Sequence, residues 1–286
     1  PLSSGGVIDL DSSHRGGDFR WTWQGAFAGG PVSLTAGVAY DAQYQHRLGF
    51  NNYVGDSLGV IGALRRDEQD DVYNIDQFAQ GTWRFAPRWS WTLGLRLSAV
   101  RFASRDHYIT ASNPDDSGRI AYESTNPVAG LMFDVSQDWH VYAAYGHGFE
   151  TPTFSEIGYR PSGESGLNFD LRPARSKNAE VGSKWRFGNG ASVDLALFQS
   201  NSRNDIAVLS SSGGRTIYQN VGRSRRRGVE LAAQMPLSDQ WRLTAAYTWV
   251  DATFRDPFGN CDARGGCHVP PGARLPGVPR TQLAAD

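Results

Sequence analysis

Apolar and polar residues alternate along most of this chain with a period of two. The clearest stretch covers residues 89–98, in which every second residue is Trp or Leu: Trp89, Trp91, Leu93, Leu95 and Leu97. Side chains of a β-strand point alternately to opposite faces, so this pattern predicts a strand with one apolar face and one polar face. Similar alternation predicts strands over residues 18–28, 32–41, 72–85, 119–135, 139–145, 179–187, 193–197, 229–235 and 241–249, and the start of another at 281–286.

Short turns and long loops alternate between these predicted strands. The short turns fall near residues 30, 87, 137, 189 and 237, and Asn189-Gly190 is a strong signal for a two-residue hairpin turn. A unit of two long strands and one large loop recurs about every fifty residues. We therefore expect all short turns at one end of the strands and all large loops at the other. The segments predicted as loops include residues 1–17, 44–70, 104–118, 147–176 and 202–223.

Two architectures fit a repeat of this length, a soluble all-β module such as a propeller and a membrane β-barrel. A propeller blade needs four short strands and a glycine-rich signature in each repeat, whereas each repeat here supplies two long strands. Lipid outside and water inside explain the contrast between the faces directly. The aromatic residues beside the short turns are typical of a girdle at a membrane interface: Trp89, Trp91, Trp139, Trp185, Phe187 and Trp241.

The composition excludes other classes of function. The 286 residues include 28 Lys and Arg against 29 Asp and Glu, and this balance gives no support for nucleic acid as a partner. No apolar run approaches the length of a membrane-spanning helix. No Gly-x-Ser-x-Gly or comparable nucleophile motif is present, and the six histidines are scattered without an evident carboxylate partner. We expect neither catalysis nor a resident cofactor or metal.

Cys261 and Cys267 lie in a segment rich in Gly, Pro and Asn. In an oxidising compartment they would close a small loop as a disulfide, and in the cytosol they would be two thiols near His268. Their spacing fits no common zinc pattern.

Three motifs in the second half of the chain, in a fixed order, are more specific than the alternation. They are YGHGFETPTFSEIG from Tyr145, LNFDLRPARSKNAEVG from Leu167, and YQNVGRSRRRGVEL from Tyr218. In this order they resemble the barrel of TonB-dependent outer-membrane receptors. The motif residues are Gly146, Gly148, Phe149, Pro152 and Glu156; Leu171, Pro173, Asn178, Glu180 and Gly182; Asn220, Val221, Gly222, Gly228 and Glu230.

This resemblance implies an all-β fold, namely a transmembrane antiparallel barrel of 22 strands in the outer membrane of a Gram-negative bacterium. Residues 1–286 would supply about ten strands and the start of an eleventh, with both ends truncated and with neither the plug domain nor the TonB-contacting segment. The whole protein would import a ferric siderophore or a similarly scarce nutrient, energised by the TonB complex through its N-terminal region. A passive porin-type channel and a soluble binding module remain alternatives.

Candidate ligand residues follow from the family analogy and from their position in the loops. Ferric siderophores are usually anionic and carry rings, which suit arginine and aromatic side chains. The candidates are Tyr108, Tyr159, Arg160, Phe169 and Arg172. Arg225 and Arg227 share the outward parity of Val229, so we expect them to contact lipopolysaccharide phosphates and outer-membrane lipid, with Arg226 facing inward.

Overall fold

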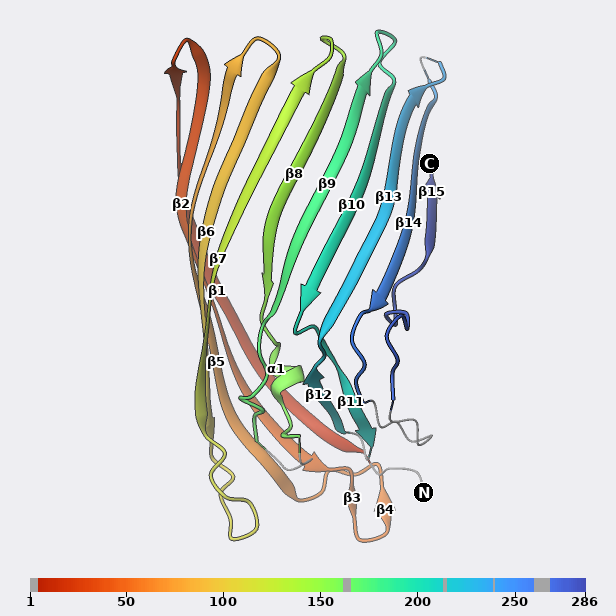
Figure 1. Ribbon diagram of the computed structural model, residues 1–286. Helices are drawn as coiled ribbons and strands as arrows, with labels where there is room; N and C mark the ends of the chain where they lie inside the picture. Colours follow the sequence, from red (N-terminus) through yellow and green to blue (C-terminus); the bar gives the residue numbers. More distant parts are fainter. Residues whose placement is uncertain (1–4, 162–165, 213–214, 239, 260–267) are drawn as a thin grey trace.

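The computed structural model describes residues 5–161, 166–212, 215–238, 240–259 and 268–286. Eleven strands form one antiparallel sheet whose order follows the chain, β1-β2-β5-β6-β7-β8-β9-β10-β13-β14-β15 (Figure 1). Their bounds are β1 Gly6–Phe27, β2 Gly30–Asn51, β5 Leu64–Ala86, β6 Trp89–Asp106, β7 Gly118–Asp134, β8 Trp139–Glu150, β9 Ala174–Arg186, β10 Ser192–Arg203, β13 Arg223–Pro236, β14 Arg242–Phe254 and β15 Thr281–Ala285. The predicted fold class, hairpin order and strand number are confirmed.

The strands near the N-terminus are longer than the alternation predicts. Residues 6–17, expected to be a loop, belong to β1, and Gly6 pairs with Asn51 at its far end. The predicted loop 44–70 is likewise wrong at both ends, because β2 continues to Asn51 and β5 begins at Leu64. These extensions lie beyond the apolar band, where neither face of a strand is restricted to apolar side chains; on β5 even the buried Arg66 and Glu68 are charged. Hydrogen-bond pairing can therefore continue there without alternation of side-chain polarity.

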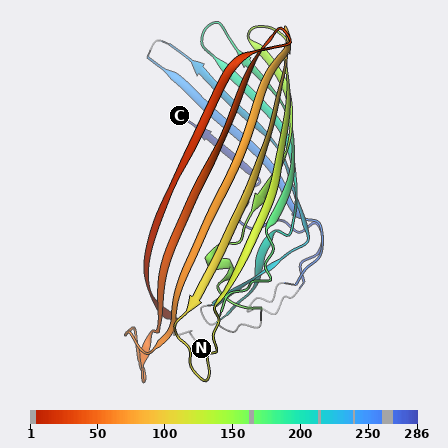
Figure 2. The same cartoon turned by 90° about the vertical axis from the view of Figure 1, so that its left-hand side faces the viewer.

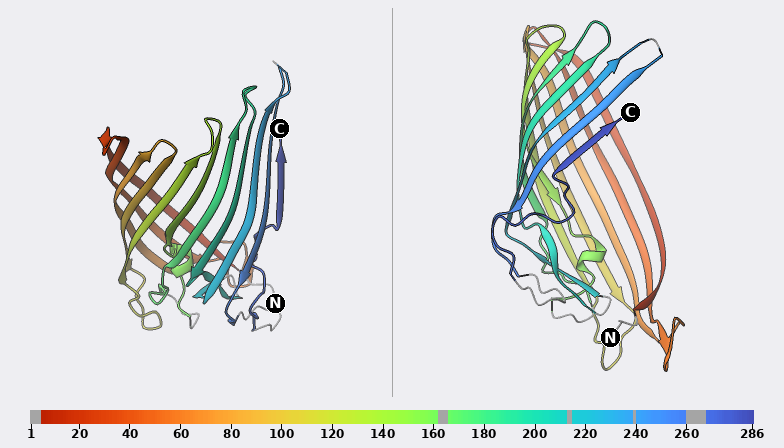
Figure 3. Two further views of the ribbon diagram at one scale, coloured as in Figure 1. Left: turned by 45° about the horizontal axis from the view of Figure 1, so that its top comes forward. Right: turned by 90° about the vertical axis from the view of Figure 1, so that its right-hand side faces the viewer.

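The sheet is strongly curved and open within this chain, with β1 and β15 at its two edges (Figures 2 and 3). Large apolar side chains of the central strands cover its convex face; among them Trp91 is 45% exposed, Leu93 56% and Leu95 42%. Their sequence neighbours on the concave face are Ser90, Thr92, Gly94 and Arg96. An apolar outer face opposite a polar inner face is the pattern of a membrane barrel around a wet lumen.

Aromatic rings gather at the short-turn end, as predicted. Trp83 and Trp91 contact each other at 6.4 Å between ring centroids, and Trp89 lies 4.6 Å from Phe133. Further along the girdle Trp139 stacks on Trp185 at 6.1 Å. Cross-strand register brings these rings together, since Trp83 pairs with Trp91 and Trp139 with Trp185.

Smaller elements occupy the large-loop end. A two-residue hairpin, β3 Tyr53–Val54 with β4 Ser57–Leu58, connects β2 to β5. A second hairpin, β11 Ile206–Ser212 with β12 Arg215–Asn220, lies within the predicted loop 202–223. The short helix α1, Phe154–Ile157, lies on the concave side of the sheet (Figure 3). In the described part of the chain, no helix has the length and hydropathy needed to cross a membrane.

The buried core is also at the large-loop end. One cluster joins Phe102 and Tyr122 of the sheet to Ile157, Leu167 and Leu171 of the segment between β8 and β9. A second cluster contains Val221, Ala252, Phe254 and Leu275. Nearer the short turns, the large apolar side chains lie instead on the exposed convex face.

Candidate functional site

The described residues between β8 and β9, 151–161 and 166–173, fold into the concave side of the sheet at its large-loop end; we call them the inner loop. Its helix α1 begins with a capping box, in which Thr153 Oγ1 accepts a hydrogen bond from the Glu156 amide and Glu156 Oε2 accepts one from the Thr153 amide. This pairing satisfies amides that a short helix would otherwise leave unbonded. The motif residue Glu156 is thus a local structural residue.

Apolar contacts fix the inner loop to β6 and β7. Ile157 is fully buried, and the Phe154 ring meets the Phe102 ring edge-on at 5.2 Å between centroids. Tyr122 contacts the same Phe102 ring, and its hydroxyl donates a hydrogen bond of 2.7 Å to the Leu171 carbonyl. Both ends of the inner loop are therefore held against one patch of the sheet.

Arg66 of β5 supplies the polar attachment. Its Nη2 donates to the Gly158 carbonyl at 3.1 Å, and its guanidinium lies 4.8 Å from the centre of the Tyr159 ring. Its Nε lies 3.3 Å from Glu68 Oε1, and both side chains are buried. Burial raises the pKa of Glu68 to about 7, although Arg66 opposes the rise. Within the described residues Glu68 Oε2 and Asp70 Oδ1 are buried without a hydrogen-bond partner, so this polar cluster is incompletely satisfied.

A second ion pair attaches the inner loop to the connection between β6 and β7. Arg160 Nη2 lies 2.8 Å from Asp116 Oδ1, and the carboxylate is buried while the arginine side chain is 40% exposed. Burial raises the pKa of Asp116, and Arg160 opposes that rise. The Asp116 amide in turn donates to Asp106 Oδ2 at 3.3 Å. The loop is therefore held by the Arg66 guanidinium of β5, by the buried Asp116 carboxylate between β6 and β7, and by apolar rings of β6 and β7.

The structure brings together three of the five predicted ligand residues. Tyr159 lies against Arg66, Arg160 pairs with Asp116, and the half-buried Phe169 packs against the buried cluster around Phe102. These contacts hold the inner loop in place. Whether the three side chains also contact a ligand stays a prediction.

The other two candidates lie apart from this cluster. Tyr108 begins the connection between β6 and β7, where its amide donates to Asp106 Oδ1 and its carbonyl accepts from Asn113. The backbone of Arg172 exchanges two hydrogen bonds with the Asn220 side chain, at 2.7 and 2.8 Å. Residue Arg172 is exposed, which leaves its guanidinium available to a ligand.

Sequence reasoning missed the residues on the sheet that anchor the inner loop. Arg66 and Glu68 lie in the charged run Arg65-Arg66-Asp67-Glu68, which resembled a solvated loop. In β5 the even-numbered members face the concave side and the odd-numbered members face outward. Every residue from Arg65 to Asp71 is polar, so no alternation of polarity could have revealed this part of the strand.

Motif glycines on the concave face lie beneath aromatic rings of neighbouring strands. A Cβ added to Gly182 would come 2.4 Å from the Tyr142 ring, and one added to Gly228 would come 2.7 Å from the Phe198 ring. Tyr142 pairs across the strands with Gly182, and Phe198 with Gly228. Gly37 and Phe78 form a similar pair in β2 and β5. Rings that cover cross-strand glycines compensate for the missing side chain.

Other motif residues make hydrogen bonds or allow close packing. Glu180 accepts a 2.6 Å hydrogen bond from the Tyr142 hydroxyl, and the Asn220 side chain donates to the carbonyls of Arg172 and Asn204.

A Cβ on Gly148 would meet Ser176, and one on Gly222 would meet Asp256. The motif residues Gly146 and Asn178 are cross-strand partners, while Glu230 pairs with Ala196 and Thr248. The remaining motif positions adjoin these groups: Phe149, Pro152, Pro173 and Val221.

Two histidines have carboxylate partners that the sequence did not predict. His46 Nε2 lies 2.9 Å from Asp67 Oδ1, and His140 Nδ1 lies 2.7 Å from Asp134 Oδ1. Both pairs join residues far apart in sequence or separated by a turn, so spacing could not reveal them.

No group of three or more His, Cys, Asp or Glu residues that could hold a metal occurs among the described residues. Cys261 and Cys267, and their predicted disulfide, lie outside the described residues.

Three of the arginines of β13, Arg225, Arg226 and Arg227, differ in their surroundings. Arg226 points inward, as expected, and its Nη2 lies 3.2 Å from Asp205 Oδ2. Arg227 points outward but pairs with Asp251 at 3.1 Å, and the outward-facing Arg225 is partly buried. An arginine already bound to a carboxylate is a weaker candidate for a lipid phosphate, so only Arg225 of the predicted pair stays a candidate.

Comparisons with known proteins agree with this geometry. Residues 4–286 match the family model described as TonB dependent receptor-like, beta-barrel. The chain is 24% identical over 225 residues to the probable TonB-dependent siderophore receptor PiuA of Acinetobacter baumannii, covering 74% of this chain and 28% of that protein. It is 25% identical over 237 residues to the ferrioxamine B receptor of Salmonella typhimurium, covering 78% of this chain and 30% of that protein.

Solved structures show the same fold. The crystal structure of the siderophore receptor PiuA from Acinetobacter baumannii superposes with a TM-score of 0.77 at 19% identity, covering 97% of this chain and 44% of that one. The unliganded ferric citrate transporter FecA gives a TM-score of 0.72 at 18% identity, covering 97% of this chain and 40% of that one. The chain thus spans less than half of the relatives and structures named here.

Proposed function

Since the chain belongs to the TonB-dependent receptor family, with residues 4–286 matching the β-barrel model, we propose that it is the central barrel region of an outer-membrane receptor for ferric siderophores. Uptake would be energised by the TonB complex through parts of the whole protein outside residues 1–286. The observation that carries this proposal is the curved sheet itself, with an apolar convex face, a polar concave face and an inner loop packed inside its large-loop end.

The barrel geometry supports uptake rather than catalysis. Lipid would cover the convex face in the outer membrane of a Gram-negative bacterium, and the polar concave face would line the import route. The large loops would lie outside the cell, where they meet the ligand first, and the short turns would lie in the periplasm.

Within this receptor we propose Arg172 as the foremost ligand contact among the five candidates. Its guanidinium is exposed, whereas Arg160 is engaged by Asp116 and Tyr159 by Arg66. A free guanidinium can bind an anionic ferric chelate without first breaking an ion pair. Tyr108, Tyr159, Arg160 and Phe169 would then shape the surface on which the chelate rests.

Growth under iron limitation tests the function. A strain lacking the gene should lose growth on one or a few ferric siderophores from a panel that includes hydroxamates and catecholates, and a plasmid copy should restore it. Deleting TonB from the complemented strain should abolish that growth again. Uptake that persists without TonB would indicate a passive channel, and unchanged growth on every iron source would contradict siderophore import.

An Arg172→Ala variant tests the ligand contact separately. It should reach the outer membrane at the normal level and bind the identified siderophore about tenfold more weakly, as for the loss of a charge-assisted hydrogen bond. Lys177→Ala is a matched control, because Lys177 faces outward on β9. Equal binding by both variants would exclude Arg172 as a contact.

A further inference from the structure

The side chain of Asn220, the last residue of β12, bonds to the backbone of two other segments. Its Oδ1 accepts a hydrogen bond of 2.7 Å from the Arg172 amide, and its Nδ2 donates to the Arg172 carbonyl at 2.8 Å. The same Nδ2 donates at 2.9 Å to the carbonyl of Asn204, which lies between β10 and β11. A side-chain amide offers one carbonyl and two N–H groups, and here all of them are used. Asn220 therefore joins the exit of the inner loop to the base of the β11–β12 hairpin.

This pairing acts on Arg172 as a neighbouring strand would. In a hydrogen-bonded pair of an antiparallel sheet, the N–H and the C=O of one residue both bond to the same partner, and Asn220 supplies both bonds from its side chain. The preceding residue is fixed as well, since Leu171 is buried and its carbonyl accepts a 2.7 Å hydrogen bond from the Tyr122 hydroxyl. Arg172 lies before the start of β9, so these bonds, rather than the sheet, determine its backbone direction. The direction of its exposed side chain follows from that backbone.

The base of the hairpin is itself fixed to the barrel wall. Asn204 has a φ of 58°, a left-handed conformation that asparagine adopts more readily than most residues, and its amide donates to the Gly222 carbonyl at 2.9 Å. The Val221 amide donates to the Asp205 carbonyl at 2.7 Å. Asp205 Oδ2 in turn lies 3.2 Å from Nη2 of Arg226 on β13. Asn220 thus holds Arg172 against an anchored structure.

Apolar packing joins the same two elements. The half-buried Tyr218 side chain of β12 packs against the cluster that contains Ile157 and Leu171. Helix α1 and strand β12 are in contact and lie side by side in Figure 1. The inner loop and the hairpin therefore form one packed unit, in which Asn220 is a hydrogen-bonded link.

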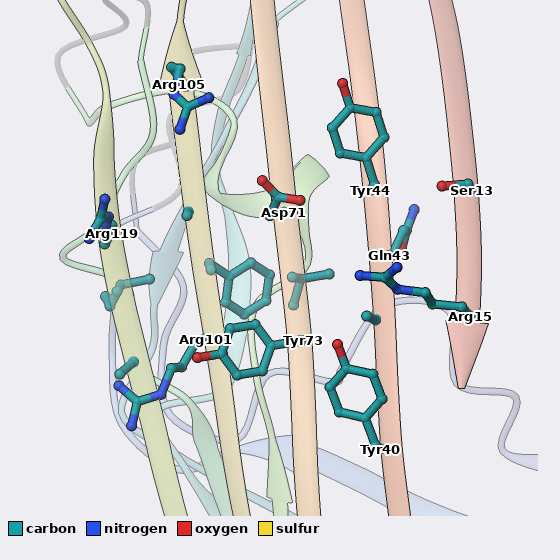
Figure 4. A pocket seen from close by; sticks show the side chains of 16 residues that line it. Ser13, Arg15, Tyr40, Gln43, Tyr44, Asp71, Tyr73, Arg101, Arg105 and Arg119 are labelled. Atoms are coloured by element: carbon teal, nitrogen blue, oxygen red, sulfur yellow. The ribbon is translucent and has the colours of Figure 1, made fainter. Parts of the chain in front are cut away.

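Arg172 differs in its location from other exposed arginines of the chain. Figure 4 shows four of these, Arg15, Arg101, Arg105 and Arg119, around a cavity of about 900 Å³ over β1, β2, β5, β6 and β7. They share the strand parity of the convex tryptophan and leucine side chains, so they face away from the concave side. Arg172 belongs instead to the inner loop on the concave side, where the direction of its guanidinium bears on a ligand inside the barrel.

We propose that Asn220 is a positioning residue for the ligand contact at Arg172. It holds the Arg172 backbone in place before an anionic ferric chelate arrives, so less conformational entropy is lost when the chelate binds. The inference rests on the proposed function, in which the Arg172 guanidinium contacts the chelate. Because Asn220 also bonds to the base of the hairpin, binding at Arg172 restrains the hairpin in the same step.

A double-mutant cycle in the full-length receptor tests this role. Wild type, N220A, R172A and N220A/R172A are purified in detergent and titrated with the ferric hydroxamate and catecholate siderophores of the growth panel, with tryptophan fluorescence as the signal. N220A should weaken binding about five- to tenfold, but less than about twofold when Arg172 is already alanine. Arg119 supplies the matched control, since N220A should weaken binding as much in an R119A background as in wild type.

Two results of the cycle would overturn the proposal. Equal weakening by N220A in the wild-type and R172A backgrounds would assign Asn220 a structural role alone, and unchanged binding by N220A would assign it no role in binding. If N220A fails to reach the outer membrane, hydrogen exchange of the unsubstituted receptor decides. The amides of Arg172 and Val221 should then be protected to a similar degree, and a bound siderophore should protect both further.

Rapid exchange at Arg172 beside a protected Val221 would also overturn the positioning role. Failure of the wild-type receptor to bind every siderophore of the panel would overturn the proposed function instead. Exchange at the Arg172 amide would still show in that case whether Asn220 holds the exit of the inner loop, so the two failures are distinguishable.

Discussion

Glu68 shows how burial changes the chemistry of a single side chain. It lies in the part of β5 beyond the lipid-facing band, beneath the inner loop, and burial raises its pKa to about 7. A raised pKa means that the folded state holds the proton more tightly than the unfolded state. The stabilisation from Glu68 is therefore complete below its ordinary pKa of 4.5 and is lost as the pH rises through about 7.

Attachment of the inner loop should accordingly weaken between about pH 4.5 and pH 7. The raised pKa values of Asp70 and Asp116 act in the same direction, while Arg47, Arg66 and Arg160 oppose them. The hydrogen-exchange protection factors of the Ile157 and Asn168 amides of the full-length receptor, which correct for the faster intrinsic exchange at high pH, should be smaller at pH 8 than at pH 5. Glu68→Gln should reduce the difference, and a difference unchanged by this substitution would refute the role of Glu68.

Gly182 illustrates why a motif position accepts no side chain. Its added Cβ would meet the Tyr142 ring, which is fixed by the hydrogen bond to Glu180. Gly182→Ala should lower the free energy of unfolding by about 1–3 kcal/mol, measured by denaturant titration of the full-length receptor in detergent. In a Tyr142→Ala background the same substitution should cost less. Gly188→Ala, with open space around its Cβ, is the control and should be nearly neutral.

At the scale of the strand, the two faces should respond differently to charge. Leu93 is 56% exposed on the convex face, and Gln80 points to the concave face at the same level, since Gln80 pairs with Gly94. Leu93→Arg should cost about 2–4 kcal/mol of folding free energy in a bilayer, because it places a charge in hydrocarbon. Gln80→Arg should cost little, because its side chain meets water. Similar costs for both, measured by refolding into vesicles, would contradict the assigned faces.

The strands also show how far alternation carries a prediction. It identified β6 almost completely, because one face of β6 meets lipid and the other meets water. It failed at residues 6–17 of β1, where either polarity is accepted, and at Leu64 to Asp71 of β5, where the concave face buries charged side chains beneath the inner loop instead of apolar ones. In those segments, hydrogen bonding to a neighbouring strand determines that a strand forms. The residues that pair are distant in the sequence, so a local pattern does not reveal them.

At the scale of the whole molecule, the two edges of the sheet govern folding in a membrane. β1 and β15 each pair on one side only within this chain, and unpaired backbone groups are costly in hydrocarbon. Residues 1–286 expressed alone should therefore fail to form a barrel that resists unfolding in SDS without heating. The full-length receptor should form one, as seen by its shifted mobility in unheated gels. Heat-modifiable mobility of the isolated segment would contradict this expectation.

The fold class, the hairpin order, the apolar and polar faces of the strands and the family could all be predicted from the amino-acid sequence. Those features depend on the alternation of apolar and polar residues, on turn residues such as Asn189-Gly190, and on the spacing of the motif glycines along the chain. They can be predicted because they depend on residues close together in the sequence and on the different polarity of the two faces of a strand.

The contacts of single side chains, in contrast, became known from the three-dimensional structure. It joined Arg66 to Gly158 and Arg160 to Asp116. These residues are separated by up to a hundred positions, and their contacts depend on strand register and on the folding of the inner loop. A sequence pattern specifies which face a residue occupies, but register and burial decide what it touches and whether its charge is free for a ligand.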